Sequence, residues 1–203
     1  MTQQPYDVVS IDELDRIPVM HGLEWRPIRR RFDVRAHGVN AYTAENPGDW
    51  VVEEHTEGNL RHQELYVVVR GHARFTLDDE DVDAPAGTFV FIEDPDVKRK
   101  AISEEPGTTV LALGASPDEP YKPSAWEWWF EAYARSPEEG AAILRDGLSE
   151  HPDHPALLYH LACMEGKLGN IGEARGHLDR AIELDPRWRE RAESDEDLTA
   201  VLA

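Results

Sequence analysis

The sequence contains little cysteine, little positive charge and no long apolar run, and each shortage excludes a class of protein. Its single cysteine, Cys163, rules out an intramolecular disulfide, so we expect a reducing, cytoplasmic setting. Lys and Arg number 21 against 41 Asp and Glu, a net charge of -20. Such a field repels phosphate backbones and anionic lipids, so we expect no nucleic-acid partner and no membrane partner. The sequence does not open with a leader-like segment, and its apolar runs are all shorter than the roughly 20 residues of a membrane helix. These features predict a soluble protein.

The texture of the chain changes near residue 120, which predicts two domains. Residues 1–24 are polar and irregular, and we interpret them as a lead-in segment with one short helix capped by Ser10 and Glu13. Residues 25–119 consist of short runs rich in Val, Phe, Thr and Tyr between frequent turn clusters, a pattern typical of an antiparallel barrel or sandwich. Residues 120–203 show helical periodicity, which predicts a capping box between Ser136 and Glu139, a turn at Gly169 and Asn170, and a closing helix from Trp188 to Leu202.

The helical tail repeats itself with a period of 34 residues. The shift superposes small, large, small and proline positions in that order, namely Gly140 on Ala174, Leu144 on Leu178, Gly147 on Ala181 and Pro152 on Pro186. This period and order resemble the tetratricopeptide repeat, which implies α-helical hairpins. The first copy begins with an aromatic stripe instead of the usual packing residues, formed by Trp126, Trp129, Phe130 and Tyr133. Because one and a half repeats rarely stand alone, we expect this stripe to be buried against the barrel or a second subunit.

Two motifs in the middle of the chain indicate the fold of the first domain. A strand led by Glu64 ends at Gly71, and a turn containing Pro85 and Gly87 precedes the apolar run at 88–92. These motifs resemble those of the cupin superfamily, small all-β barrels of the double-stranded β-helix or jelly-roll type. The resemblance covers roughly residues 38–114 and implies one cupin barrel.

The resemblance also implies a metal site, because cupins usually hold a metal on a His-x-His pair, a glutamate and a last histidine. Glu64 matches the motif glutamate, and His55 and Glu57 replace the histidine pair if the following loop is two residues longer than usual. Strand parity places His62 on the same face as Glu64, either as a further ligand or as an ordinary hydrogen-bonding histidine. The candidate ligands suit Fe, Mn, Ni or Zn by ligand type.

Counting forward from Gly87 puts Lys98 where a cupin has its last histidine. An ammonium group repels a divalent ion but neutralises nearby carboxylates, so Lys98 could replace the metal beside Glu57 and Glu64. Nearby carboxylates favour the charged form of Lys98, which argues against a nucleophilic lysine. On this interpretation the barrel binds a small molecule, and the candidate ligand-binding residues are Tyr66, Val68, Phe89, Phe91 and Lys98.

Three functions remain open from the sequence. The favoured one is a non-catalytic barrel that binds a small molecule or is structural, with a helical tail for self-association or partner contact. The alternative is a metal-dependent cupin enzyme of the dioxygenase, isomerase or decarboxylase type. The third is a scaffold in which the tetratricopeptide-like tail does the binding. We also expect a homodimer, because the sheet has edge strands to cover and the short tail an apolar end.

Overall fold

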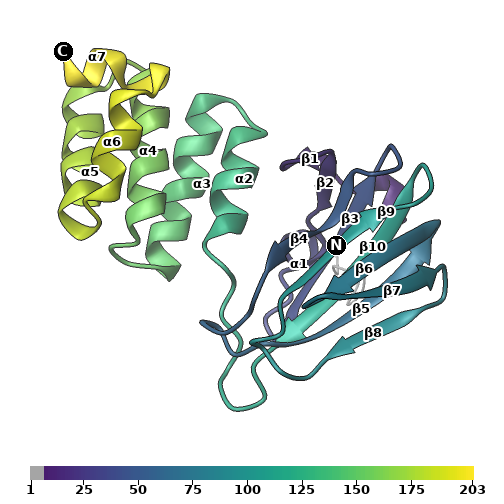
Figure 1. Ribbon diagram of the computed structural model, residues 1–203. Helices are drawn as coiled ribbons and strands as arrows, with labels where there is room; N and C mark the ends of the chain where they lie inside the picture. Colours follow the sequence, from purple (N-terminus) through teal and green to yellow (C-terminus); the bar gives the residue numbers. More distant parts are fainter. Residues whose placement is uncertain (1–6) are drawn as a thin grey trace, which may run out of the picture. The chain divides into compact units, whose positions relative to one another are not determined.

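The structure is a computed structural model that describes residues 7–203, and residues 1–6 of the lead-in segment lie outside the described residues. The chain divides into two compact units, Met1–Pro123 and Ser124–Ala203 (Figure 1). Within residues 7–203, no helix is both long and apolar enough to cross a membrane.

The first unit is a sandwich of two antiparallel sheets. The larger sheet has the order β1-β2-β3-β10-β5-β8 and the smaller one β4-β9-β6-β7. Strands distant in sequence are neighbours in both sheets, as in a jelly roll. The strands are β1 (Ile17–Pro18), β2 (Leu23–Arg26), β3 (Gly38–Ala44), β4 (Trp50–His55), β5 (Gln63–Arg70), β6 (His72–Leu77), β7 (Glu80–Pro85), β8 (Phe89–Ile92), β9 (Arg99–Ser103) and β10 (Thr108–Ala115).

The core lies between the sheets, because alternate side chains of each strand point inward. Tyr66 of β5 and Phe75 of β6 meet across it with ring centroids 5.5 Å apart. Gly71, between β5 and β6, has a φ of 72°, and a Cβ there would lie 2.5 Å from Oγ1 of Thr108. The glycine predicted to end the first motif is therefore required by both backbone conformation and space.

The lead-in segment differs from the expectation, because part of it belongs to the larger sheet. Its short helix, η1 (Ile11–Glu13), has the predicted capping box between Ser10 and Glu13. β1 then pairs with β2 through Ile17 and Trp25, so the segment up to residue 24 is not a separate lead-in. The first unit also contains α1 (Ile28–Phe32), which lies against β3.

The second unit is helical, as expected. Its elements are α2 (Trp126–Tyr133), α3 (Pro137–Glu150), α4 (Pro155–Lys167), α5 (Ile171–Leu184), α6 (Arg187–Glu193), η2 (Glu196–Leu198) and α7 (Thr199–Leu202). Ser136 and Glu139 form the predicted capping box of α3, and Gly169 makes the predicted turn before α5 with a φ of 77°. The closing helix expected from Trp188 to Leu202 is broken, because Asp195 caps the new turn η2.

Helix α2 packs in its own unit through two sets of residues, and only the second belongs to the aromatic stripe. Trp128 and Ala132 are buried against α3. Trp129 and Tyr133 lie beside His160 of α4, each with ring centroids 5.4 Å from the imidazole. These aromatic contacts join α2 to α4, and Tyr133 nevertheless remains partly exposed.

Candidate metal centre

A cluster of titratable side chains lies at one end of the sandwich, where strands of both sheets meet. His55 ends β4 of the smaller sheet and Arg99 begins β9 beside it, since these two residues are paired in register. Glu64 and Tyr66 lie on β5 of the larger sheet, and Glu57 lies on the connection between β4 and β5.

Three of the predicted ligand residues converge here. The Nε2 atom of His55 lies 3.6 Å from Oε1 of Glu57 and 3.6 Å from Oε2 of Glu64. One ligand atom from each of the three residues lies within 4.8 Å of the others. Zinc-like ions bind nitrogen and oxygen at 2.0–2.2 Å, so two donors on one tetrahedral ion are roughly 3.4 Å apart. The three residues therefore fit a divalent ion after only small adjustments.

His62 lies behind this set. Its Nδ1 atom is 3.4 Å from Oε2 of Glu57, the oxygen facing away from His55 in the contact above. Burial lowers the pKa of His62, so its neutral imidazole is favoured, although the charge of Glu64 opposes this effect. A neutral imidazole can orient Glu57 or serve as a fourth donor.

The two carboxylates of the cluster titrate differently. Burial, and then the charge of Glu64, raise the pKa of Glu57 to about 7. Burial also acts on Glu64, but hydrogen bonds from His55 and Tyr66 and the charge of Arg99 outweigh it and lower the pKa of Glu64. Tyr66 donates a hydrogen bond of 2.6 Å to Glu64. Glu64 is thus held as a carboxylate, while Glu57 needs a further positive charge to ionise fully near neutral pH.

The imidazole of His55 is favoured in its charged form. Burial disfavours that charge, but Glu64, the backbone carbonyl of Glu53 and then Glu57 outweigh it and raise the pKa of His55. A metal ion would have to displace this proton, since a histidine ligand is neutral. The cluster thus attracts positive charge, whether as protons or as a cation.

Arg99 is the member of the cluster that the sequence pattern did not reveal. Its side chain is 0% exposed, and its Nε atom lies 3.5 Å from Oε2 of Glu64. Nη1 reaches the carbonyl of Pro95 at 3.4 Å, whereas Nε and Nη2 have no hydrogen-bond partner among the described residues. A permanent positive charge is therefore built into the cluster.

Lys98 does not lie where it was expected. Its Nζ atom is on the surface, 2.7 Å from Oε1 of Glu54. Lys98 comes just before β9, and successive side chains of an extended chain point to opposite faces. The prediction that Lys98 lies beside Glu57 and Glu64 is wrong. Arg99, one residue later, takes the inward place.

The predicted ligand-binding wall also needs correction. Tyr66 and Val68 face the core and are almost fully buried. Phe89 and Phe91 point away from the core instead, since Val90 and Ile92 are the buried residues of β8. Phe89 and Phe91 therefore cannot contact a molecule inside the sandwich.

The helical unit holds a second group of ligand-type side chains, Cys163, Asp195 and Asp197. Tyr159 donates a 2.6 Å hydrogen bond to Asp195, and Nζ of Lys167 lies 2.9 Å from Asp197. Burial, followed by the charge of Asp195, raises the pKa of Cys163 to about 12. These contacts already satisfy the group, and a structural hydrogen-bond network accounts for it.

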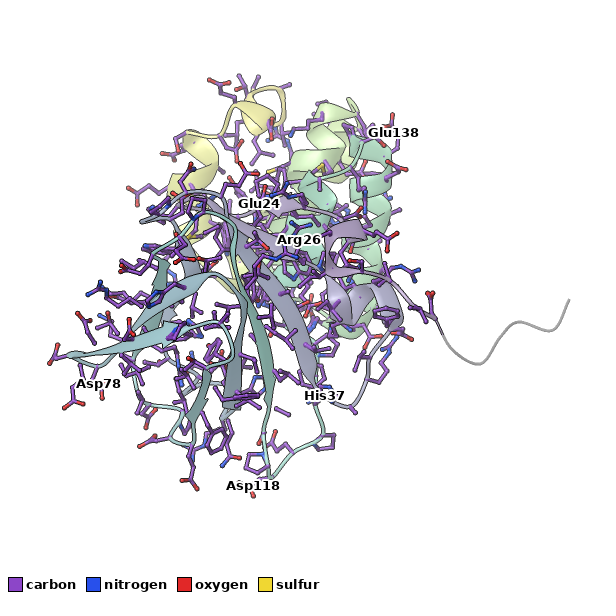
Figure 2. All side chains as sticks on the ribbon, turned by 90° about the vertical axis from the view of Figure 1, so that its right-hand side faces the viewer. Glu24, Arg26, His37, Asp78, Asp118 and Glu138 are labelled. Carbon is purple, nitrogen blue, oxygen red and sulfur yellow. The ribbon has the colours of Figure 1, made fainter. Side chains whose placement is uncertain are left out.

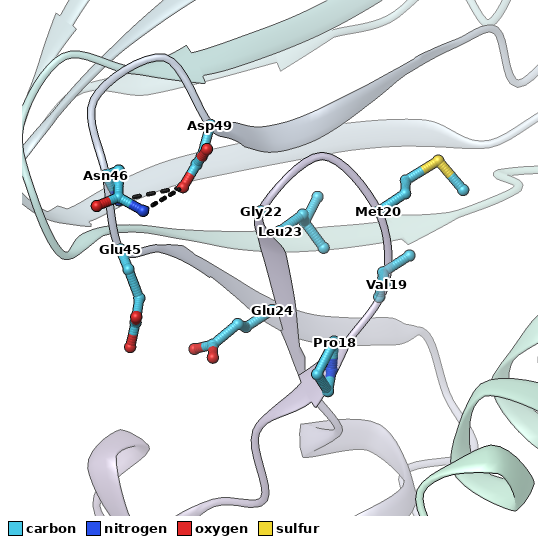
Figure 3. A pocket seen from close by; sticks show the side chains of 9 residues that line it. All are labelled: Pro18, Val19, Met20, Gly22, Leu23, Glu24, Glu45, Asn46 and Asp49. Carbon is cyan, nitrogen blue, oxygen red and sulfur yellow. Dashed lines mark hydrogen bonds between the residues drawn. The ribbon is translucent and has the colours of Figure 1, made fainter.

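An open pocket of about 300 Å³ lies elsewhere on the first unit (Figure 3). It is lined by the turn around Gly22 and by Glu24, Glu45 and Asp49. Asp49 accepts hydrogen bonds from the backbone and side-chain nitrogens of Asn46, so it holds the turn in shape. This pocket does not include any residue of the His55–Glu64 cluster.

Comparison with known proteins gives matches at the level of structure only. No family model matches the chain, and no curated protein matches it. KdgF of Halomonas sp. is similar with a TM-score of 0.42 and 18% identity, over 51% of this chain and 86% of that one. A sugar phosphate isomerase from the cupin superfamily of Silicibacter pomeroyi has a TM-score of 0.46 and 16% identity, over 54% and 75%. An RmlC-like cupin of Shewanella frigidimarina has a TM-score of 0.43 and 16% identity, over 58% and 97%.

Proposed function

We propose that the first unit is a cupin-type divalent metal centre that binds and transforms a small molecule. The observation that carries the proposal is the convergence of His55, Glu57 and Glu64, with Nε2 of His55 3.6 Å from each carboxylate and all three ligand atoms within 4.8 Å of one another. The raised pKa of Glu57 adds to it, because a divalent cation would relieve the repulsion between the two carboxylates. The ligand types suit Fe, Mn, Ni or Zn.

The residues of the chain divide the work between holding and orienting. His55, Glu57 and Glu64 would hold the ion, and a bound ion would supply a Lewis acid for an oxygen atom of the small molecule. Tyr66 fixes the orientation of Glu64 through its 2.6 Å hydrogen bond. His62 lies against the second oxygen of Glu57, where it can orient that carboxylate or exchange a proton with it.

The first test is metal analysis of untagged protein purified without chelator, followed by calorimetric titration with each ion. We expect stoichiometric binding that Glu64→Gln reduces at least about tenfold, as expected when a ligand is lost. Glu54→Gln is the matched control, since Glu54 lies on β4 beside His55 but pairs with Lys98 on the surface. Failure of the folded wild-type protein to bind any of the four ions would overturn the metal centre.

A second candidate, a metal-free barrel that binds a small molecule without catalysis or is structural, is favoured by Arg99. This buried guanidinium already neutralises part of the charge of Glu64. On this alternative the protein binds no metal, and replacing Arg99 by methionine is sufficient on its own to destabilise the cluster. The metal titration separates the two candidates.

For the second unit we propose a tetratricopeptide-like module for protein contact. The proposal is supported by the equivalent small residues that allow close helix packing, because Gly140, Gly147, Ala174 and Ala181 are all buried. Leu144 and Leu178, the equivalent large residues, are buried as well. A scaffold role predicts that Tyr133→Ala on the exposed aromatic face removes a co-purifying protein partner. Co-purification of the same partner with both the wild type and Tyr133→Ala would refute this role.

A further inference from the structure

The outer face of the larger sheet changes from covered to exposed across its width. A row of residues paired in register crosses this face from Arg26 of β2 through Ala41, Leu111 and Val67 to Phe89 of β8. Arg26 is 4% exposed and Ala41 0%, whereas Phe89 is 67% exposed. Something therefore covers the β2–β3 half of the face and not the β5–β8 half.

The cover is the segment around η1. Nη1 of Arg26 donates to the carbonyl of Leu14 at 3.2 Å, and Asp12 pairs with Arg70 of β5 at 3.1 Å. Because β3 and β10 separate β2 from β5, this segment crosses both strands. Figure 2 labels Glu24 and Arg26, which lie on strand β2 of the larger sheet.

The uncovered half carries an apolar patch, which we call the β5–β8 patch. Its outward-facing residues are all uncharged and apolar, namely Leu65, Val67, Val69, Phe89 and Phe91. Phe91 is 59% exposed and Val69 46%. Two neighbouring, largely exposed phenylalanines on one strand form more apolar surface than scattered single residues do.

The patch lies on a free sheet edge. Among the described residues, β8 pairs with β5 and with no other strand (Figure 1). Its sequence, Phe-Val-Phe-Ile, contains none of the lysines, prolines or bulges with which proteins protect an edge. The unpaired backbone groups of β8 and the exposed rings of Phe89 and Phe91 thus occur on the same four residues.

We propose that the β5–β8 patch binds a second copy of this chain, with β8 pairing antiparallel to β8 of the other copy about a two-fold axis. Antiparallel pairing of one strand with itself is symmetric, so the same surface serves both partners. It also places Glu93 and Asp94 of each copy beside the uncharged Gly87 and Thr88 of the other. Parallel pairing would set the acidic ends side by side, which costs free energy.

The absence of charge from the β5–β8 patch makes it the surface where a second copy can approach despite the net charge of the molecule. Two chains with a net charge of -20 each repel one another over most of their surface. The β5–β8 patch has no charged side chain, so its burial costs no desolvation of ions. Because four-residue strands bury less than the about 800 Å² per partner of a standard interface, we expect a dimer that dissociates on dilution.

Sedimentation velocity of the full chain over a concentration series tests the proposal. We expect a monomer–dimer equilibrium that Phe89→Glu/Phe91→Glu weakens at least about tenfold, which corresponds to about 1.4 kcal/mol. The matched control is Leu184→Glu/Leu202→Glu, which adds the same charge at exposed apolar residues of the helical unit. We expect the control to dimerise like the wild type, apart from the small effect of the added charge.

Hydrogen exchange on the wild-type protein gives a second, mutation-free measurement. The amides of Phe89–Ile92 should exchange more slowly as concentration rises, since pairing protects them. A wild type that stays monomeric at all concentrations overturns the proposal. So does a dimer that survives both phenylalanine substitutions, or one that the helical control disrupts equally.

Discussion

At the scale of single residues, the cluster depends on which of two neighbouring cations points inward. Lys98 and Arg99 are adjacent, yet Lys98 pairs with Glu54 on the surface and Arg99 is fully buried beside Glu64. Counting from Gly87 cannot decide between them, because the pairing of β4 with β9 shifts register twice before His55. Irregular pairing of this kind leaves no mark in the sequence.

Replacing Arg99 by methionine should destabilise the first unit by about 3 kcal/mol, because Glu64 would lose its buried countercharge. The pKa of Glu64 should rise for the same reason. Urea unfolding measures the loss, and Lys98→Met, on the exposed neighbour, should change stability by less than about 0.5 kcal/mol. A divalent ion that binds to the His55–Glu64 cluster should restore part of the stability that Arg99→Met loses. Equal effects of the two substitutions would contradict the placement of Arg99.

A histidine of the helical unit should make stability depend on pH. Burial, then the charges of Arg191 and His154, lower the pKa of His160 to about 4. The unfolded chain therefore binds a proton near pH 6.5 that the folded chain refuses, so stability is lost as pH falls below that value. Between pH 7 and pH 5 the loss attributable to His160 should reach about 2 kcal/mol.

Denaturant unfolding followed by far-ultraviolet circular dichroism measures this loss. His160→Gln should flatten the pH dependence between pH 7 and pH 5. An identical slope in wild type and His160→Gln would show that His160 titrates normally.

At the scale of helices and strands, the predictable features were those that follow from local rules. The capping boxes at Ser10 and Ser136 formed as predicted, because such bonds join residues three positions apart. The faces of β8 could not be predicted, since Phe-Val-Phe-Ile is apolar at every position and has no period of two. The break at Asp195 was missed because its turn depends on contacts with Tyr159 of α4.

Two glycines in different helices of the second unit should respond oppositely to alanine. A Cβ at Gly147 of α3 would lie 2.7 Å from the ring of Trp128, whereas one at Gly176 of α5 meets nothing within 4 Å. Gly176→Ala should stabilise the helical unit by about 0.5–1 kcal/mol through helix propensity. Gly147→Ala gains the same propensity but loses about 1–3 kcal/mol to overpacking, so we expect net destabilisation.

Thermal unfolding of both variants measures the difference. Because each change adds one methyl group to a helical glycine, Gly176→Ala serves as the control for Gly147→Ala. A higher melting temperature for Gly147→Ala than for the wild type would show that Trp128 can move aside and that α2 and α3 are loosely packed.

At the scale of the whole molecule, net charge should govern self-association. Two copies of a chain with 41 acidic and 21 basic residues repel each other through water. Salt screens this repulsion, with a Debye length of about 30 Å at 0.01 M and 8 Å at 0.15 M. The proposed dimer should therefore tighten as sodium chloride rises over this range, which sedimentation equilibrium measures. A dimer held by ion pairs would loosen instead.

Residues 11–14 form a strap across β3 and β10, and this strap limits how many copies of the chain can associate. It leaves the β5–β8 patch as the exposed apolar part of this face, so a dimer that joins two such patches has none left and association stops at two. Were residues 11–14 to detach, the β2–β3 half of the face, with Arg26 and Ala41, would also be exposed, and no symmetry relates it to the β5–β8 patch. Contacts made through this second half need not form a closed assembly, and they would extend the dimer into an open-ended fibre.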